Sequence, residues 1–479
     1  MKKFYITTAI DYVNAEPHIG HAYQKIVADV LARWHRLKGE QVFFLTGTDE
    51  HGQKIAKSAE LAGLEPKEFC DKMSAKFKEA WDTLNIKYDR FIRTTDTNHE
   101  AFVQNFIKKI KDDIYKGEYE GLYCVDCEAY CTEKDAVNGL CPVHKKPLEK
   151  LKEETYFFKL SKYKDKLLEL YENPKFVLPE TRKNEIVNRV KESLKDLSIT
   201  RTNFKWGIPF PLDKKHVVYV WFDALLNYLT GAGKKQEFWP AQAHLLGKDN
   251  GWFHAVIWPA MLLSAGYKIP ETIFIHGFLT INGEKISKSL GNAISPVYLA
   301  KKYGADTIRY FILRNIPFGE DGDFNEKSLV ERHNNELANN LGNLVLRVCT
   351  LAEKYRLKKC KNKLLEKLKF EEIERHIGNY EVDKALALIF EFIDSCNEYI
   401  QRKKPWEKDC QDRSEILYEL IYSIKAVSFL LWPFIPETAE KIAKALGFEI
   451  RSFKEITKPI ESSNIKKPEI LFQKIRISE

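Results

Sequence analysis

Two short motifs, far apart in the chain, carry residue types that bind phosphate. The first is His18–His21 (HIGH), which follows an apolar run at Phe4–Ile10 and opens a helical pattern at Ile19–Leu37. Two imidazoles and a glycine at the start of a helix lie where unpaired backbone N–H groups and the helix dipole attract anions. The second is Lys285–Ser289 (KISKS), which supplies two ammonium groups and two hydroxyls after another strand-like run. A site built from both motifs would hold a triphosphate from two sides.

The elements around the first motif predict an α/β fold with a doubly wound parallel sheet. A strand at Phe4–Ile10, a helix at Ile19–Leu37 and a strand at Gln41–Thr46 form a βαβ unit, which begins a Rossmann-like nucleotide-binding domain. The pattern then changes to short segments, turns and cysteines, which is typical of an inserted module. Strand-like runs return at 217–221 and 243–246, where we expect the parallel sheet to resume.

The C-terminal end of the chain has a helical pattern. Val382, Leu386, Ile389 and Ile393 share one face of a predicted helix, and the strand pattern disappears beyond about residue 324. We therefore expect an all-α helical bundle. The predicted divisions are 1–116 for the first half of the Rossmann-like domain, 117–216 for the insertion, 217–280 for its second half, 281–327 for the KISKS loop and linking region, and 328–479 for the bundle.

The composition indicates a globular protein of several domains. The chain has 479 residues, of which 44% are hydrophobic and 30% charged. No apolar stretch reaches the roughly 18 residues needed to span a bilayer. The strand pattern begins directly after Met1–Lys3, without a signal segment. We therefore expect a cytoplasmic protein with no membrane partner, and the net charge of +8 is compatible with a polyanionic one.

Clustered cysteines in the insertion predict a metal site. Cys124, Cys127, Cys141 and His144 form two C-x-x-C/H pairs, and each pair can bend into a knuckle that directs both donors at one ion. Without an export signal, such clusters indicate metal binding rather than disulfides. The spacing predicts one Cys₃His zinc per chain, with Cys131 as a competing ligand that fits neither knuckle. Four protein donors leave no position for substrate, so this zinc would be structural.

The chain resembles the methionyl-tRNA synthetase family of class I over essentially its whole length. The resemblance rests on several motifs in the family's order: 9–14 with HIGH, 47–52 (GTDEHG), 218–224 (VYVWFDA), 247–249 (GKD) leading to 253–254 and 258–260, KISKS, 339–343 with 347, and 404–406. It implies a ligase that forms methionyl-adenylate and pyrophosphate from L-methionine and Mg-ATP. The methionyl group then passes to the 3′-terminal adenosine of initiator or elongator tRNA(Met), which releases AMP.

The resemblance also implies which residues act. The catalytic residues would be His18, His21, Lys285 and Lys288. ATP would further contact Gly20, Gly247, Asp249 and Ser287, with Mg²⁺ arriving on the nucleotide. The methionine pocket would comprise Ile10, Tyr12, Asp49, Trp221, Ala224, Leu225, Tyr228, Asn250, Phe253, His254 and Trp258. Aromatic rings suit a thioether, and Asp49 would face the α-ammonium. Asn250 and Leu225 stand where other members carry Ile and Pro, and Ile286 stands where Met is more frequent.

The implied anticodon contacts are Asn339, Asn343, Arg347 and Trp406, because RNA loops are read by stacking on aromatic side chains and by hydrogen bonds to base edges. A core tryptophan is the alternative for Trp406.

Three other functions are weighed against this one. Isoleucyl, valyl and leucyl synthetases carry a large editing domain, for which the insertion at 117–216 is short. Cysteinyl synthetase uses an open active-site zinc, unlike a closed Cys₃His shell. A non-catalytic tRNA- or protein-binding relative would not need the histidines of HIGH or the lysines of KISKS. The appended tRNA-binding and dimerization domain of some family members is not present, so we expect a monomer.

Overall fold

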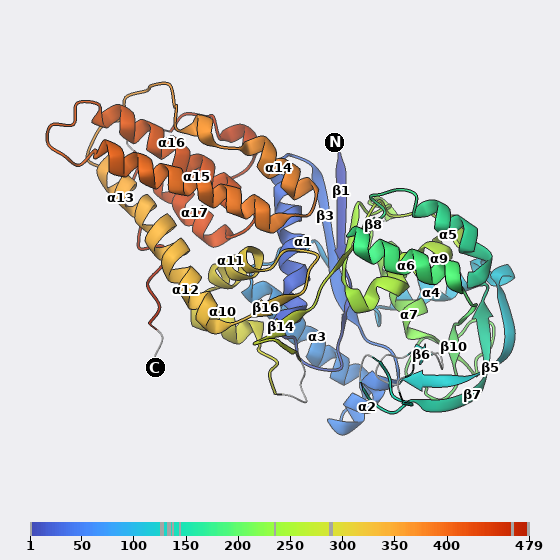
Figure 1. The fold of residues 1–479 in the computed structure, drawn as a ribbon. Coiled ribbons are helices and arrows are strands. Elements are labelled where there is room, and N and C mark those ends of the chain that lie inside the picture. The colour runs from blue at the N-terminus through green and yellow to red at the C-terminus, as the bar shows by residue number, and fades with distance from the viewer. Residues whose placement is uncertain are drawn as a thin grey trace.

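The computed structural model describes residues 2–124, 129–131, 136, 138–142, 145–233, 236–286, 291–460 and 464–476. For residues 119–120, 129–131, 151–153 and 285 only the backbone is described. Figure 1 shows an N-terminal sheet with its helices beside a C-terminal bundle of long helices. None of the described helices combines the length and the apolar character that crossing a bilayer requires.

A parallel sheet forms the centre of the N-terminal part, as the sequence predicts. Its strands are β1 (Lys3–Thr8), β2 (Asp11–Tyr12), β3 (Gln41–Asp49), β4 (Arg90–Arg93), β8 (Val177–Leu178), β12 (Ala243–Gly247) and β13 (Ile273–His276). The seven strands run in the order β2-β3-β1-β12-β13-β8, with β4 paired to β3. Every neighbouring pair is parallel. Strands from the beginning of the chain therefore lie beside strands that follow the predicted insertion.

Both faces of this sheet are buried, as the alternating side chains of β1 show. Phe4 and Ile6 pack into one apolar cluster with α1 (Ile19–Leu37), whereas Tyr5 packs into the cluster on the opposite face. Strands covered on both faces are typical of doubly wound α/β folds. The other helices of this part are α2 (Gln53–Leu61), α3 (Pro66–Thr83), α4 (Thr97–Lys109), α7 (Val220–Ala224), α8 (Asn227–Thr230) and α9 (Trp258–Ala265).

An antiparallel sheet occupies much of the region predicted as an insertion. Its strands are β5 (Ile114–Cys124), β6 (Ala129–Cys131), β7 (Glu149–Phe158) and β9 (Leu197–Ser198), in the order β6-β5-β7-β9. The segment between β7 and β9 contains α5 (Lys164–Leu170), β8 and α6 (Glu180–Glu192). There β8 returns to the parallel sheet and pairs with β13. β11 (Val217–Val218) pairs antiparallel with β10 (Thr200–Arg201) in a separate two-stranded sheet and leads into α7. The prediction that the parallel sheet resumes at 217–221 is therefore wrong, and it resumes at β12.

A small sheet and two helices connect the Rossmann-like part to the bundle. They are β14 (Leu279–Ile281), β15 (Glu284–Lys285), α10 (Pro296–Tyr303), α11 (Ala305–Asn315) and β16 (Gly322–Phe324). In the sheet β14 lies between β15 and β16, so the KISKS motif begins in an edge strand.

The C-terminal part is helical, as predicted, and its described residues contain no strand after β16. Its helices are α12 (Glu326–Arg332), the π-helical segment η6 (His333–Gly342), α13 (Asn343–Ala352), α14 (Phe370–Gly378), α15 (Val382–Lys403), α16 (Arg413–Leu431) and α17 (Pro436–Ala445). Val382, Leu386, Ile389 and Ile393 are all buried on α15, which confirms the predicted apolar face.

A buried ionic network joins α1 to the bundle. Arg309 on α11 places Nη2 2.8 Å from Asp29 Oδ2 on α1. The same guanidinium donates to the carbonyl oxygens of Phe434, at 2.7 Å, and Pro433, at 2.8 Å, in the corner between α16 and α17. Arg33 also donates to Asp29 at 2.8 Å. The helix that carries HIGH is thus held directly against the helical bundle.

Candidate active site

The HIGH motif caps the N-terminus of α1 with its own imidazoles. His18 Nδ1 accepts the Gly20 N–H at 3.2 Å, and His21 Nδ1 accepts the His18 N–H at 3.1 Å. The two ring centroids are 3.8 Å apart. Because each Nδ1 accepts a backbone N–H, a neutral ring carries its proton on Nε2. The arrangement therefore presents two N–H donors beside a helix N-terminus, as an anion site requires.

The first residues of the second motif lie against HIGH. A Cβ built on Gly20 would lie 3.2 Å from Ile286 Cδ1 and 3.0 Å from His18 Nδ1. Lys285 lies on β15 with its backbone described, whereas Ser287 and Lys288 fall outside the described residues. The structure thus brings together two motifs that are far apart in the chain.

The GKD motif lies at the carboxyl end of β12, on the edge of the parallel sheet where ligands bind in this class of fold. A Cβ built on Gly247 would lie 2.9 Å from Asp249 Oδ1. The absence of a side chain at Gly247 therefore lets the Asp249 carboxylate lie close to the backbone there.

Most residues of the predicted methionine pocket share one apolar cluster. Leu225, Tyr228 and Trp258 are buried in it, and Ile10, Tyr12, Trp221 and Phe253 pack against it. Ala224 is buried at the end of α7. The rings of Trp221 and Phe253 stack at 3.8 Å, nearly parallel.

His254 is held by two hydrogen bonds in this cluster. Its Nδ1 lies 3.0 Å from the Asn250 carbonyl oxygen, which can only accept, so Nδ1 carries the proton. Its Nε2 then accepts the Tyr228 hydroxyl at 2.6 Å. Burial lowers the pKa of His254 to about 4, so the ring is neutral. Asn250 contributes its backbone carbonyl here, which needs no particular side chain.

Asp49 ends β3 and pairs in register with Tyr12 on β2. Burial raises the pKa of Tyr228, and the charge of Asp49 raises it further. The Asp49 carboxylate therefore acts electrostatically on the cluster that contains the predicted pocket.

Two motifs contain a buried network for which the sequence predicted no role. The Asp223 carboxylate accepts hydrogen bonds from His51 Nδ1 and His99 Nε2, both at 2.7 Å. Burial alone would raise the pKa of Asp223, but the two histidines hold it below its ordinary value. Burial would lower the pKa of His51, yet Asp223 raises it to about 10. His51 belongs to GTDEHG and Asp223 to VYVWFDA. A histidine in one motif and an aspartate in the other could have indicated an ion pair between them.

Two of the predicted zinc ligands are described. Cys124 ends β5 and Cys141 lies in a tight loop, and both are buried. That loop is closed by the Cys141 N–H, which donates to the Lys146 carbonyl oxygen at 2.8 Å, and by the Lys145 N–H, which donates to the Cys141 oxygen at 2.8 Å. Cys127 and His144 lie outside the described residues. Two buried thiols on β5 and a closed loop fit the donor chemistry of zinc, and the site stays a prediction.

A second group in the insertion resembles a metal site in composition. The donor atoms of Glu154, Asp213 and His216 lie within 4.8 Å of one another. However, Lys116 Nζ lies 2.8 Å from Glu154 and 4.0 Å from Asp213. The ammonium group already supplies positive charge, so the group is explained as an ion-pair cluster.

The predicted anticodon residues lie on η6, on α13 and in the loop after α15. Trp406 is 41% exposed, so it is not a core residue. Arg347 lies over its ring at 5.7 Å and donates to Asn397 Oδ1 at 3.2 Å. Asn397 in turn donates to Asn340 Oδ1 at 2.6 Å. Asn339 and Asn343 are exposed.

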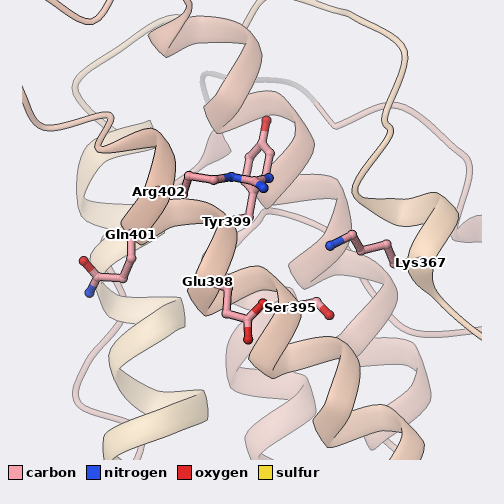
Figure 2. A pocket seen from close by; sticks show the side chains of 6 residues that line it. All are labelled: Lys367, Ser395, Glu398, Tyr399, Gln401 and Arg402. Atoms are coloured by element: carbon pink, nitrogen blue, oxygen red, sulfur yellow. The ribbon is translucent and has the colours of Figure 1, made fainter.

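A cavity of about 490 Å³ lies on the helical bundle (Figure 2). Lys367 faces it from the segment before α14, and the other lining residues come from α15: Ser395, Glu398, Tyr399, Gln401 and Arg402. None of the predicted site residues lines this cavity.

Comparisons with known proteins agree along the whole chain. The family model of tRNA synthetases class I (M) matches residues 4–150 and 143–349, and that of the anticodon-binding domain of tRNA ligase matches 362–476. A methionine–tRNA ligase of Thermotoga maritima is 45% identical, over 99% of this chain and 80% of its own length. One of Nostoc sp. is 43% identical, over 95% of this chain and 92% of its own length.

Solved structures show the same relationship. Mycobacterium tuberculosis methionyl-tRNA synthetase in complex with methionyl-adenylate has a TM-score of 0.94 and 40% identity, and the match covers 98% of this chain and 100% of that one. The apo form of that protein has a TM-score of 0.87 and 36% identity, with 100% and 99% coverage. These matches set aside the other class I synthetases considered above. The chain belongs to the methionine–tRNA ligase family of class I tRNA synthetases.

Proposed function

We propose that this chain joins L-methionine to tRNA(Met) in two steps at the site described above. In the first step, the methionine carboxylate attacks the α-phosphorus of ATP. Methionyl-adenylate forms, and pyrophosphate is the leaving group. In the second step, a ribose hydroxyl of the terminal adenosine of tRNA attacks the adenylate carbonyl, and AMP leaves. The substrate carboxylate is already a nucleophile, so the protein supplies alignment and stabilisation of charge.

The observation that carries this proposal is the contact between Gly20 and Ile286. It brings HIGH to the start of KISKS at the carboxyl edge of a parallel sheet, where nucleotides bind. We assign the Nε2–H groups of His18 and His21 to the ATP phosphates. Lys285, Ser287 and Lys288 would contact the β- and γ-phosphates from the other side. Mg²⁺ bound to the nucleotide would neutralise part of the phosphate charge.

The aromatic cluster supports methionine as the amino acid. The stacked rings of Trp221 and Phe253 offer an apolar, polarizable surface that suits a thioether. The Tyr228–His254 hydrogen bond places two polar groups within an apolar pocket, where a purely aliphatic competitor has no use for them. Asp49, at the end of β3, is the proposed partner of the α-ammonium.

The ribose and the anticodon complete the proposed contacts. Gly247 and Asp249 would bind ribose hydroxyls. Trp406 would stack on an anticodon base, while Arg347, with Asn339 and Asn343, would bond to base edges. The half-exposed indole, held over a guanidinium, supports that role because it is accessible and yet ordered.

The remaining predictions belong to the same proposal. Cys124, Cys127, Cys141 and His144 would hold one structural zinc, which shapes the insertion and takes no part in the chemistry. The domain divisions at 117, 217, 281 and 328 and a cytoplasmic monomer also stay predictions.

The decisive experiment is amino-acid-dependent ATP–pyrophosphate exchange with each of the twenty amino acids. Methionine alone should support rapid exchange, and tRNA(Met) should then be charged with methionine. Exchange driven better by another amino acid, or no exchange with any, would overturn the proposal.

A further inference from the structure

The buried imidazole of His276 has an acceptor atom that nothing in the described structure satisfies. His276 ends β13 and is 6% exposed. Its Nδ1 lies 2.7 Å from the Gly277 carbonyl oxygen. A carbonyl oxygen can only accept, so Nδ1 carries the ring proton and Nε2 has a lone pair. Among the described residues, no donor reaches Nε2.

Protonation does not explain this orphaned atom. Burial, with a smaller contribution from the charge of Lys25, lowers the pKa of His276 to about 4 despite the bond to Gly277. The ring is therefore neutral at physiological pH. It also has little freedom to turn toward another partner, because Tyr23 packs edge-on at 5.1 Å and Phe318 stacks at 5.6 Å. A buried acceptor without a donor is costly, and such groups in native proteins call for an explanation.

The position of His276 supplies that explanation. β12 and β13 are parallel neighbours whose register pairs Gly247 with His276. A Cβ built on Gly247 would lie 2.9 Å from Asp249 Oδ1, 3.7 Å from His276 Cε1 and 4.0 Å from His276 Nε2. A carboxylate and a neutral imidazole thus both lie beside the position that a side chain at residue 247 would take.

We propose that His276 Nε2 accepts a hydrogen bond from a ribose hydroxyl of ATP, beside Asp249. This inference rests on the function proposed above. Ribose carries two neighbouring hydroxyls, and each is a donor, so a vicinal diol matches two adjacent acceptors. A 2′-deoxy- or 3′-deoxynucleotide would leave the buried Nε2 without its donor. His276 therefore contributes to the selection of a ribonucleotide as well as to its binding.

The test uses two variants that differ in which imidazole nitrogen they replace. His276→Asn places an amide near Nδ1, which keeps the bond to Gly277, and leaves nothing at Nε2. His276→Gln places an amide near Nε2, so an acceptor oxygen is retained there. Each protein is assayed by methionine-dependent pyrophosphate exchange with ATP, 2′-deoxy-ATP, 3′-deoxy-ATP and a triphosphate of purine riboside, which lacks the 6-amino group.

The wild type should use one deoxynucleotide with a kcat/KM about tenfold or more below that of ATP. His276→Asn should lose activity with ATP by a similar factor and should discriminate far less against that same analogue. His276→Gln should recover part of the discrimination. The KM for methionine and the melting temperature should change little in either variant.

Three outcomes would overturn the inference. One is unchanged discrimination against both deoxynucleotides in His276→Asn, and another is a wild type that uses both deoxynucleotides as well as it uses ATP. The third is discrimination lost only against the purine riboside nucleotide, which would assign Nε2 to the adenine amino group. Failure of the proposed function is distinguishable, because the wild type would then show no methionine-dependent exchange with ATP itself.

Discussion

Gly20 and Ile286 lie in contact, with the Cδ1 methyl of Ile286 3.2 Å from the point where a side chain at Gly20 would begin. Gly20 belongs to the first turn of α1, and Ile286 directly follows β15. A side chain at residue 20 would be tight against both Ile286 and the His18 ring, so these neighbours would have to shift to admit it. The contact is the point at which the two motifs that we propose to bind the ATP phosphates meet.

Trp406 should matter only when tRNA is present. A stacked base is worth about 1–3 kcal/mol by alanine substitution, so Trp406→Ala should lower tRNA charging by about one to two orders of magnitude. Pyrophosphate exchange should stay near the wild-type rate, since that step uses no tRNA. Tyr115→Ala is a matched control, because Tyr115 is 40% exposed and Trp406 41%. Equal losses of charging and exchange in Trp406→Ala would refute the anticodon assignment.

The His51–Asp223 ion pair should make stability depend on pH. Asp223, with smaller contributions from Glu100 and Asp49, raises the pKa of His51 from 6.5 to about 10 against the effect of burial. A raised pKa means that the stabilisation is complete below about pH 6.5 and is lost as the pH rises through about 10. The melting temperature of the wild type minus that of His51→Gln should therefore be largest below pH 6.5 and shrink toward pH 10. A difference that grows in that range would contradict the ion pair.

Arg309 should be essential to the packing of α1 against the helical bundle. Arg309→Met would remove donors from three carbonyl oxygens and one of the charges that face the buried Asp29. Breaking a buried pair in this way costs about 3–5 kcal/mol, so the melting temperature should fall markedly. Arg309→Lys should recover little, because an ammonium group cannot reproduce the planar fork.

Arg451→Met is the control for Arg309. Arg451 pairs with Glu449, but 71% of its side chain is exposed. Its replacement should leave the melting temperature unchanged. Similar shifts of the melting temperature in Arg309→Met and Arg451→Met would mean that the buried network stabilises the protein no more than an exposed ion pair does.

Zinc should be structural. Elemental analysis should find about one zinc per chain, as expected for a Cys₃His site. Cys124→Ser or His144→Ala should release it and increase proteolytic cleavage within the insertion. Cys360→Ser, at a thiol in the helical bundle, should retain the metal. Zinc that stays bound after both knuckle substitutions would rule out the predicted ligand set.

The strands and helices with a clear apolar run or helical repeat of their own could be predicted from the sequence. β1, α1 and β3 follow from an apolar run, a long helical repeat and a second apolar run, and the buried face of α15 follows from Val382, Leu386, Ile389 and Ile393. In contrast, β8 is a two-residue edge strand, too short for any periodicity. Its place depends on pairing with β13, which only the folded chain brings near.

Local geometry limited the prediction of the anticodon face. The sequence places Asn339, Asn343 and Arg347 on one face only if the whole segment is a regular α-helix. The segment His333–Gly342 is π-helical, which turns successive residues by a different angle. As a result Asn340, rather than Asn339, bonds to Asn397 beside Arg347.

The network around Asp223 and the orphaned nitrogen of His276 could not be predicted in the same way. Each depends on residues from distant strands and on which ring nitrogen faces a carbonyl oxygen. Motif spacing does not contain that information. His18, His21 and Gly20, by comparison, are neighbours in sequence, so their place at a helix N-terminus was predictable.

The most direct test of a single ATP site built from HIGH and KISKS is a double-mutant cycle on Gly20 and Ile286. Gly20→Ala adds a methyl group that would meet both Ile286 Cδ1 and the His18 ring, and Ile286→Val deletes the Cδ1 atom alone. Alanine favours helices over glycine, which offsets part of the overpacking cost, so Gly20→Ala should change the melting temperature little. Gly378→Ala is the control, because a Cβ there would meet nothing within 4 Å.

The measurement is kcat/KM for ATP in methionine-dependent pyrophosphate exchange for the four proteins of the cycle. Gly20→Ala should lower it by about tenfold or more, on the scale of 1–3 kcal/mol for overpacking. Ile286→Val alone should change it little, and the double variant should recover part of the loss. Strictly additive effects, or a Gly20→Ala variant as active as Gly378→Ala, would contradict the account that the two motifs meet to bind ATP.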